Sequence, residues 1–334
     1  MKIIFQALLL IMAASFLALL ISVLSSERQG DGVLKKSENQ KVEIILTGDV
    51  MLGRSVMTKS IEESDTSYPF RKVGEVLRDA DLVIINLENP IISNCPASSE
   101  GYIFCTSPEL VEGLVFAGVD IVNLANNHSN NYGEGGLQET INTLKENNID
   151  SVGVGELLVK ELGGKRFGFL GFDFTTRVPE EKDYDFIDYA ASQTDILIVS
   201  VHWGLEYTQN PTNSQKQWAK EMINSGVDVV VGHGPHWVQD VEYINNKPVY
   251  YSLGNFIFDQ YFSQETQEGL MLNFKFSEQD LSIQLYPVDV TNSQPILMEE
   301  SAAKIWLQKL AERSESALSV PLKEGRIVVS NNYK

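Results

Sequence analysis

Short apolar runs alternate with amphipathic stretches along most of the chain after residue 41. The runs have the length and β-branched content of buried strands, and the stretches between them repeat apolar positions with a helical period. We expect strands at 42–48, 81–88, 119–125, 150–155, 165–172, 194–204 and 227–234. We expect helices at 68–80, 108–118, 134–147 and 213–226. Alternation of this kind predicts a largely parallel sheet covered by helices.

The pattern changes near residue 237. Strand pairs are expected across 237–290, followed by a helix at 298–314 and a short final strand in "GRIVVS". This strand-rich region implies a second, mixed sheet. The sequence therefore predicts one α/β domain over residues 42–334, a two-sheet sandwich flanked by helices.

A long apolar run, Ile3–Leu24, lies close to the start of the chain and is broken only by Gln6 and two serines. It is long enough to cross a bilayer and longer than the apolar part of a usual signal peptide. We expect residues 1–24 to be a transmembrane signal-anchor, with a cleaved signal peptide as the alternative. Residues 25–41 are polar and read as a flexible tether. The domain is expected to be extracytoplasmic, held at the cell membrane, or secreted if the signal is cleaved.

Two cysteines, Cys95 and Cys105, lie in the loop-like stretch "SNCPASSEGYIFC". In an exported protein this arrangement favours one loop-closing disulfide, and two separate buried thiols are the alternative. Zinc binding is disfavoured because no histidine or further cysteine is near. A disulfide would support export independently of the apolar run.

Composition restricts the partners. Hydrophobic content of 43% and charged content of 21% are typical of a globular protein. The formal net charge of −19 excludes a nucleic-acid partner, because phosphate backbones are bound by lysine and arginine surfaces. The same charge opposes long-range attraction of any anionic polymer.

Ionisable side chains follow several of the expected strands. The carboxyl ends of parallel strands form one edge of a sheet, where ligands commonly bind. Each residue alone has a plainer interpretation as a turn former, a helix cap or a structural histidine. Their conjunction favours one shared site, because all four histidines of the chain occupy such positions. The residues are Asp49, Glu88, His128, His202, His233 and His236.

This set of side chains predicts a metal site. Imidazole, carboxylate and amide oxygen are ligands for divalent ions such as Mn²⁺, Zn²⁺, Fe²⁺ or Mg²⁺. A carboxylate that bridges two ions could organise a nucleophilic hydroxide. We therefore expect one or two divalent ions, and the absence of cysteine ligands disfavours a structural zinc.

Six motifs occur in order over about residues 42–290, and together they resemble the CapA family of poly-γ-glutamate capsule synthesis proteins. That family is related to the calcineurin-like metallophosphoesterases. The resemblance implies a metallophosphoesterase-like sandwich and a membrane-anchored, extracytoplasmic placement. The motifs are "GDVMLGR" (48–54), "NLENPI" (86–91), "NLANNHSNNYGEGGL" (123–137), "VSVHWGLEY" (199–207), "VVVGHGPHWVQ" (229–239) and "YSLGNFIFD" (251–259).

The resemblance also assigns roles to residues. It implies that Asp49 has a catalytic as well as a metal-binding role, and that His128 is a proton donor rather than a ligand. Asn126 and the later asparagines 130 and 131 are expected from their residue type to form turns. The implied metal ligands are Asp49, Glu88, Asn127, His202, His233 and His236.

Two further residues are candidates for substrate binding. Arg54 follows Asp49 closely and could hold a carboxylate or phosphate, although a surface or helix-terminal arginine is the alternative. Asn255 lies just after an expected strand and could line the same crevice, unless it belongs to an ordinary turn.

Two departures from the phosphoesterase pattern are visible. The first motif carries Met51 where that pattern has a histidine, so one ligand is missing. The last motif has an extra residue, Gly234-Pro235, between its histidines. These departures weaken the expected site that contains Asp49, Glu88 and His236.

The leading hypothesis is a CapA-like protein in the synthesis, export or processing of poly-γ-glutamate or a similar surface polymer. Metal-assisted hydrolysis or acyl transfer would be its chemistry. One alternative is a divalent-metal phosphoesterase acting on a small or lipid-linked phosphate. The other is a non-catalytic assembly module that works with other membrane subunits of a polymer synthase.

Overall fold

The computed structural model describes residues 41–98, 101–102, 104–277 and 280–330. The predicted signal-anchor, residues 1–24, and all of the predicted tether except Lys41 lie outside these ranges. Lys41–Lys334 forms one compact unit. Within the described ranges, no helix has both the length and the apolar character needed to cross a membrane.

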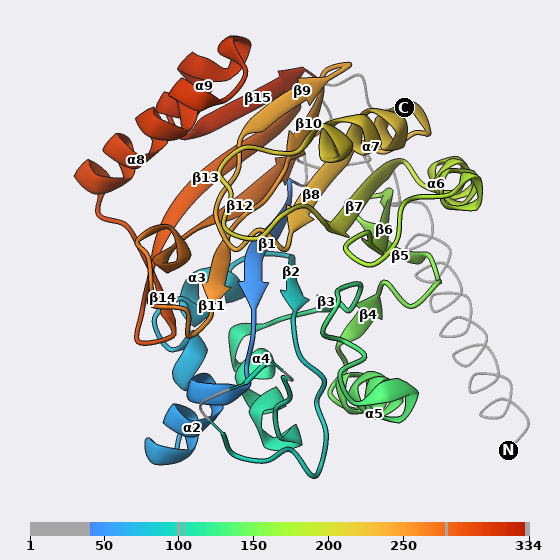
Figure 1. Ribbon diagram of the computed structural model, residues 1–334. Helices are drawn as coiled ribbons and strands as arrows, with labels where there is room; N and C mark the ends of the chain where they lie inside the picture. The colour runs from blue at the N-terminus through green and yellow to red at the C-terminus, as the bar shows by residue number, and fades with distance from the viewer. Residues whose placement is uncertain (1–40, 99–100, 103, 278–279, 331–334) are drawn as a thin grey trace, which may run out of the picture. The chain divides into compact units, whose positions relative to one another are not determined.

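One sheet brings together strands from the beginning and the end of the domain (Figure 1). Its first four strands along the chain pair in parallel, and its later strands add one parallel pair and several antiparallel pairs. In spatial order it contains β14 (Gln294–Leu297), β13 (Asp280–Thr291), β12 (Glu268–Phe276), β1 (Val42–Val50), β2 (Leu82–Leu87), β3 (Ile121–Asn123) and β4 (Asp150–Val152). Beside this path, β11 (Asn255–Ile257) pairs with β1 and β15 (Arg326–Ser330) pairs with β13.

The second sheet is built from the middle of the chain. Its central strands are parallel, and an antiparallel hairpin flanks them on each side. In spatial order it contains β5 (Leu158–Leu162), β6 (Lys165–Asp173), β7 (Ile196–His202), β8 (Val229–His233), β10 (Lys247–Tyr250) and β9 (Val241–Ile244).

The two sheets pack face to face, as the alternation of buried side chains shows. In β1, Ile44 and Leu46 join the central core, whereas Ile45 joins the core on the outer face. In β7, Ile198 faces the central core and Leu197 faces the opposite side. Because side chains alternate along a strand, both faces of each sheet are buried, and each outer face needs a covering layer.

Helices supply that layer, which confirms the predicted mixed α/β arrangement of two sheets. The outer face of the first sheet packs on α2 (Arg54–Glu62), α3 (Gly74–Arg78), α4 (Val111–Ala117) and α5 (Gly133–Glu146). The second sheet is covered by α6 (Glu181–Gln193) and α7 (Asn213–Asn224). The helices α8 (Glu300–Arg313) and α9 (Ser319–Lys323) pack on the central core. Short 3₁₀ helices are η1 (Tyr68–Phe70), η2 (Pro108–Leu110), η3 (Glu265–Gln267) and η4 (Ser316–Leu318).

Some expected elements are corrected by the structure. The single helix expected at 68–80 is wrong, because the chain forms η1 and then the separate short helix α3. Gly74 begins α3, and a Cβ there would lie 2.6 Å from Phe116 Cε1, so this glycine serves close packing rather than helix continuity. The strand expected at 150–155 ends at Val152, and α2 and α6 were not expected at all.

The start of α6 provides a test of an ion pair. Burial alone would raise the pKa of Asp183, but hydrogen bonds from Arg177 and from the backbone N–H of Glu180 outweigh it and lower that pKa below 3.8. A lowered carboxyl pKa stabilises the fold above the unfolded pKa, and this stabilisation is lost as the pH falls through the folded value. We expect Asp183→Asn to cost on the order of 1–2 kcal/mol at pH 7. The difference from wild type should disappear in acid.

Urea unfolding of both proteins at pH 7 and near pH 3 measures this effect. The matched control is Asp185→Asn, which removes an exposed carboxylate from the same helix and should change the stability at pH 7 little. Equal losses in the two variants would show that the contacts of Asp183 do not stabilise the helix start.

Candidate metal centre

Five of the predicted ligands meet where four strands end. Asp49 lies near the end of β1, Glu88 directly follows β2, and His202 and His233 are the last residues of β7 and β8. His202 and His233 are direct partners in the second sheet. His236 joins them from the following loop. All five side chains are buried.

The distances among these side chains are short. Asp49 Oδ1 lies 3.0 Å from His233 Nδ1, and Asp49 Oδ2 lies 3.3 Å from His236 Nδ1. Glu88 Oε1 lies 3.6 Å from His202 Nδ1. Asp49, Glu88 and His236 each offer one ligand atom, and these three atoms lie within 4.8 Å of one another. Neighbouring ligands around one ion of bond length near 2.1 Å are separated by about 3.0–3.4 Å, so small side-chain movements would bring these three atoms onto one ion.

The charges in the cluster also fit a cation. Burial raises the pKa of Glu88 well above its usual value, and the nearby charge of Asp49 raises it further. Burial would likewise raise the pKa of Asp49, but hydrogen bonds from His233 and His236 hold it well below the usual range. Glu88 Oε2 is buried and has no hydrogen-bond partner. A divalent cation would neutralise the two carboxylates and give this oxygen a partner.

His202 is in the form that binds metals. Burial lowers the pKa of His202 to about 3, although Asp49 opposes the shift. A neutral imidazole keeps one ring nitrogen with a free electron pair, which ligation requires. The residues present therefore fit a divalent cation held by carboxylate and imidazole groups.

Asn86, which the sequence reasoning missed, lies at the centre of the cluster. Its Nδ2 donates to Asp49 Oδ1 at 3.0 Å and to Glu88 Oε1 at 3.1 Å. Its Oδ1 accepts from the side chains of Asn123 and Asn126 at 3.0 and 3.3 Å. This amide orients both carboxylates toward the histidines. The available signal was one polar residue inside the otherwise apolar run "LVIINL".

The adjacent asparagines 126 and 127 lie in different environments. Asn126 is buried, donates to the carbonyl of Leu87 at 2.8 Å and accepts from the backbone N–H groups of His128 and Ser129. This matches the turn-forming role expected for Asn126. Asn127, expected as a ligand, has an exposed side chain with its Nδ2 3.3 Å from His128 Nε2. The structure thus places the Asn127 amide against His128, outside the buried cluster.

His128 lies beside the cluster and contacts an aromatic ring. Its imidazole stacks on Phe104 with 4.0 Å between ring centroids. Its Nδ1 is 3.2 Å from Asn131 Nδ2. Burial is the largest cause that lowers the pKa of His128, to about 4. At neutral pH the ring is therefore uncharged, and each of its nitrogens faces the amide nitrogen of an asparagine, Nδ1 that of Asn131 and Nε2 that of Asn127.

The guanidinium of Arg54 is held by contacts within the protein. Its guanidinium forms an ion pair with the buried carboxylate of Asp259 and donates to the carbonyl of Gly101 at 3.0 Å. The guanidinium carbon lies 4.6 Å from the centroid of the Phe104 ring. Asp259 also accepts from the backbone N–H of Ser55 at 3.1 Å, which fixes the start of α2. Arg54 is thus placed next to the site with its charge balanced by Asp259.

Asn255 holds the candidate ligand His236 in position. Its Oδ1 lies 3.1 Å from His236 Nδ1, and its Nδ2 donates to Gln260 Oε1 at 3.0 Å. Gln260 in turn donates to the hydroxyl of Tyr207 at 3.1 Å. An amide oxygen facing Nδ1 holds the proton there and leaves Nε2 of His236 with its electron pair.

Three of the nine non-glycine residues with positive φ in the described ranges lie around the same place. Arg54, Tyr207 and His236 have φ values of 46°, 59° and 58°. Side chains other than glycine rarely adopt this left-handed region, and such strain is commonly found at functional sites.

Met51 occupies the place where the phosphoesterase pattern has a histidine. Its side chain is fully buried in the core on the outer face of the first sheet. Its sulfur accepts the backbone N–H of Gly53 at 3.1 Å. The residue therefore packs as a core side chain.

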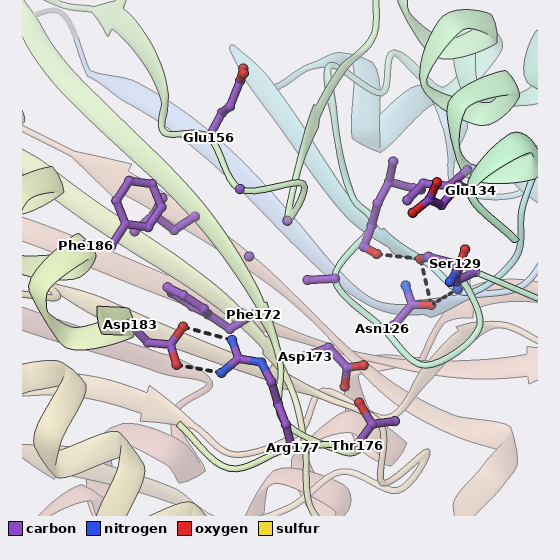
Figure 2. A pocket seen from close by; sticks show the side chains of 18 residues that line it. Asn126, Ser129, Glu134, Glu156, Phe172, Asp173, Thr176, Arg177, Asp183 and Phe186 are labelled. Carbon is purple, nitrogen blue, oxygen red and sulfur yellow. Dashed lines mark hydrogen bonds and ion pairs between the residues drawn. The ribbon is translucent and has the colours of Figure 1, made fainter. Parts of the chain in front are cut away.

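A cavity of about 530 Å³ adjoins the cluster at the ends of β3, β4 and β6. Figure 2 shows Asn126 and Ser129 on one wall and the paired Arg177 and Asp183 on another. Because Arg177 is neutralised by Asp183, the remaining carboxylates make the cavity acidic. They belong to Glu134, Glu156 and Asp173. This cavity is unfavourable for an anionic chain.

The predicted disulfide between Cys95 and Cys105 is confirmed. Thr106, the next residue, donates through Oγ1 to the carbonyl of Leu52 at 2.9 Å and through its backbone N–H to that of Pro90 at 2.9 Å. Thr106 therefore attaches the end of the disulfide-closed segment to Leu52, shortly after Asp49, and to Pro90, shortly after Glu88.

Known proteins resemble this chain in sequence. The family model described as "Bacterial capsule synthesis protein PGA_cap" matches residues 43–260, which include every candidate ligand. The capsule biosynthesis protein CapA of Bacillus anthracis is 28% identical over 333 residues, covering 90% of this chain and 80% of that protein. The PGA biosynthesis protein CapA of Bacillus subtilis (strain 168) is 28% identical over 282 residues, covering 77% of this chain and 74% of that protein. Among solved structures, a hypothetical protein from Thermus thermophilus is 16% identical, with a TM-score of 0.45, over 76% of this chain and 96% of that chain.

Proposed function

Because the chain belongs to the PGA_cap family of bacterial capsule synthesis proteins, we propose that it acts in the synthesis, export or processing of poly-γ-glutamate or a similar anionic surface polymer. The names of the two CapA relatives support this class of polymer. We further propose that it works as a metal-dependent enzyme of metallophosphoesterase type, by hydrolysis or acyl transfer.

One observation carries the enzymatic part of the proposal. Two buried carboxylates and the buried imidazole of His236 offer ligand atoms within 4.8 Å of one another, two further buried imidazoles contact these carboxylates, and one carboxylate oxygen has no partner. Burying such groups together is unfavourable without a compensating cation. Asp49, Glu88, His202, His233 and His236 would hold it. A bound divalent cation would polarise the scissile carbonyl or phosphoryl group and activate water.

Three further side chains have supporting roles at the proposed metal site. Asn86 fixes the two carboxylates, and Asn255 fixes the tautomer of His236. We propose that His128, which is uncharged at neutral pH, donates a hydrogen bond to the leaving group.

The acidic character of the protein restricts how a polyanion approaches. The net charge is −19, and the cavity beside the site is lined by carboxylates. Contact with an anionic chain is therefore local and depends on the cations at the site and on screening by salt. Lys59 on α2 is a cation near Arg54, with its Nζ 3.3 Å from the hydroxyl of Tyr261. We propose that the chain approaches from this side.

We also propose an extracytoplasmic location, with residues 1–24 as a membrane anchor or a cleaved signal. The Cys95–Cys105 disulfide supports this location, because such bonds persist in oxidising compartments.

A second candidate function is a non-catalytic assembly module that works with other membrane subunits. Met51 favours it, because a core-packed methionine stands in the place of a metal ligand.

One experiment separates these candidates. The purified full-length chain is incubated with Mn²⁺ and a γ-linked glutamate oligomer, and the oligomer length is followed by mass spectrometry. We expect a change in chain length that is lost in His202→Ala. Turnover of an aryl phosphate alone would favour the phosphoesterase alternative. No turnover, together with normal polymer production by a host that carries His202→Ala, would favour the assembly module.

A further inference from the structure

Phe104 connects two groups of the candidate site. Its ring is 4% exposed and stacks on the imidazole of His128 at 4.0 Å and 30°. The guanidinium carbon of Arg54 lies 4.6 Å from the centroid of the same ring. Flat contact with a ring adds a constraint on the tilt of the imidazole to that of the hydrogen bonds at its edge.

A second aromatic ring extends this contact toward the metal ligands. Phe258 meets Phe104 edge-on at 6.2 Å and meets the His236 ring at 4.9 Å. The two phenylalanines therefore fill the space between His128 and His236. The position of His128 relative to the ligands is set through this pair of rings.

Phe104 directly precedes the disulfide-bonded Cys105. A Cβ on Gly53 would lie 2.3 Å from the Cys105 carbonyl oxygen, so the two backbones touch at this point. The backbone N–H of Ile92 donates to the carbonyl of Thr106 at 2.9 Å. The disulfide also ties Cys105 to Cys95, so a covalent bond and these contacts together hold the backbone directly after Phe104.

We propose that Phe104 is a positioning residue for His128, and that the Cys95–Cys105 disulfide holds Phe104 in place. The proposal rests on the proposed function only for its effect on turnover, because the contact itself can be measured without activity. A reduced disulfide would release the ring from His128 and leave the buried ligands unchanged.

Nuclear magnetic resonance of histidine-labelled full-length chain tests the contact. The chain has four histidines, so each gives a separate imidazole signal, and His128→Gln identifies the one of interest. A proton above the face of an aromatic ring is shielded. We expect Phe104→Leu to move the His128 signal downfield and to leave the signals of the three other histidines in place. Phe104→Tyr should keep the wild-type position.

The controls separate positioning from general damage to the fold. Tyr102 lies in the same disulfide-closed segment and is 88% exposed, so Tyr102→Ala should move none of the signals. The double variant Cys95→Ala/Cys105→Ala should move the His128 signal as Phe104→Leu does. An unchanged His128 signal in Phe104→Leu would overturn the role of Phe104, and an unchanged signal in the double cysteine variant would overturn the role of the disulfide.

Turnover measurements test the role of Phe104 independently of the resonance signals. With the γ-linked oligomer we expect Phe104→Leu to lower kcat about tenfold or more, with KM and bound metal near wild type. Restoration of kcat in Phe104→Tyr would support positioning over a structural role. If the wild type turns over no substrate while the His128 signal still responds to Phe104→Leu, the proposed function fails and the contact stands.

Discussion

Replacing Asp49 by asparagine is expected to weaken the binding of Mn²⁺ or Zn²⁺ by about 100-fold or more. The variant keeps the shape of the side chain but removes the charge that faces His233 and His236. It also replaces a carboxylate oxygen by an amide nitrogen that cannot bind a cation. Isothermal titration calorimetry of the metal-stripped full-length chain measures the loss.

Asp173→Asn is the matched control for this prediction. It removes the same charge from the acidic cavity next to the site, and Asp173 accepts from Thr175 rather than from a histidine. Metal affinity should stay within a few-fold of wild type. Equal losses in the two variants would show that metal binding follows net charge rather than the cluster around Asp49.

Gly48→Ala is expected to cost about 3 kcal/mol of folding free energy and to weaken metal binding as well. A Cβ at this position would lie 2.2 Å from the carbonyl oxygen of Gly254. The backbone N–H of Asp49 donates to that same oxygen at 2.8 Å. The methyl group must therefore push β1 away from the segment before β11, which moves Asp49. Urea unfolding and metal titration measure the two effects.

Gly135→Ala is the control for that substitution. Gly135 lies in α5, and a Cβ there would meet nothing within 4 Å. Alanine should raise stability by about 0.5–1 kcal/mol, because it has the higher helix propensity. If Gly48→Ala unfolds at the same urea concentration as wild type, the close approach of β1 to Gly254 has no energetic consequence.

The sequence predicted the sandwich because its signals are local. Apolar runs identify the strands that carry Asp49, Glu88, His202 and His233, and parallel pairing brings their carboxyl ends to one edge. The helix α6 was missed because acidic residues alternate with apolar ones at its start, which obscures the helical period, and its capping box depends on the side chains of Glu180 and Asp183.

The parts of the site that escaped prediction depend on distant contacts. Asn86 reads as one polar residue in an apolar strand, and its role becomes visible only when β1 and β3 flank β2. Arg54 and Asp259 are 205 residues apart in the sequence, so no local pattern indicates that they pair. The stacking of Phe104 on His128 depends on the disulfide-closed segment, whose path is not encoded in a periodic pattern.

The central claim is that the buried carboxylate–histidine cluster holds a divalent cation. Crystals of the full-length chain grown with Mn²⁺, with diffraction measured at the manganese absorption edge, test it directly. We predict an anomalous difference peak in contact with Asp49, Glu88 and His236. At saturating Mn²⁺, a cluster with no such peak and with Glu88 Oε2 still lacking a partner would contradict the account.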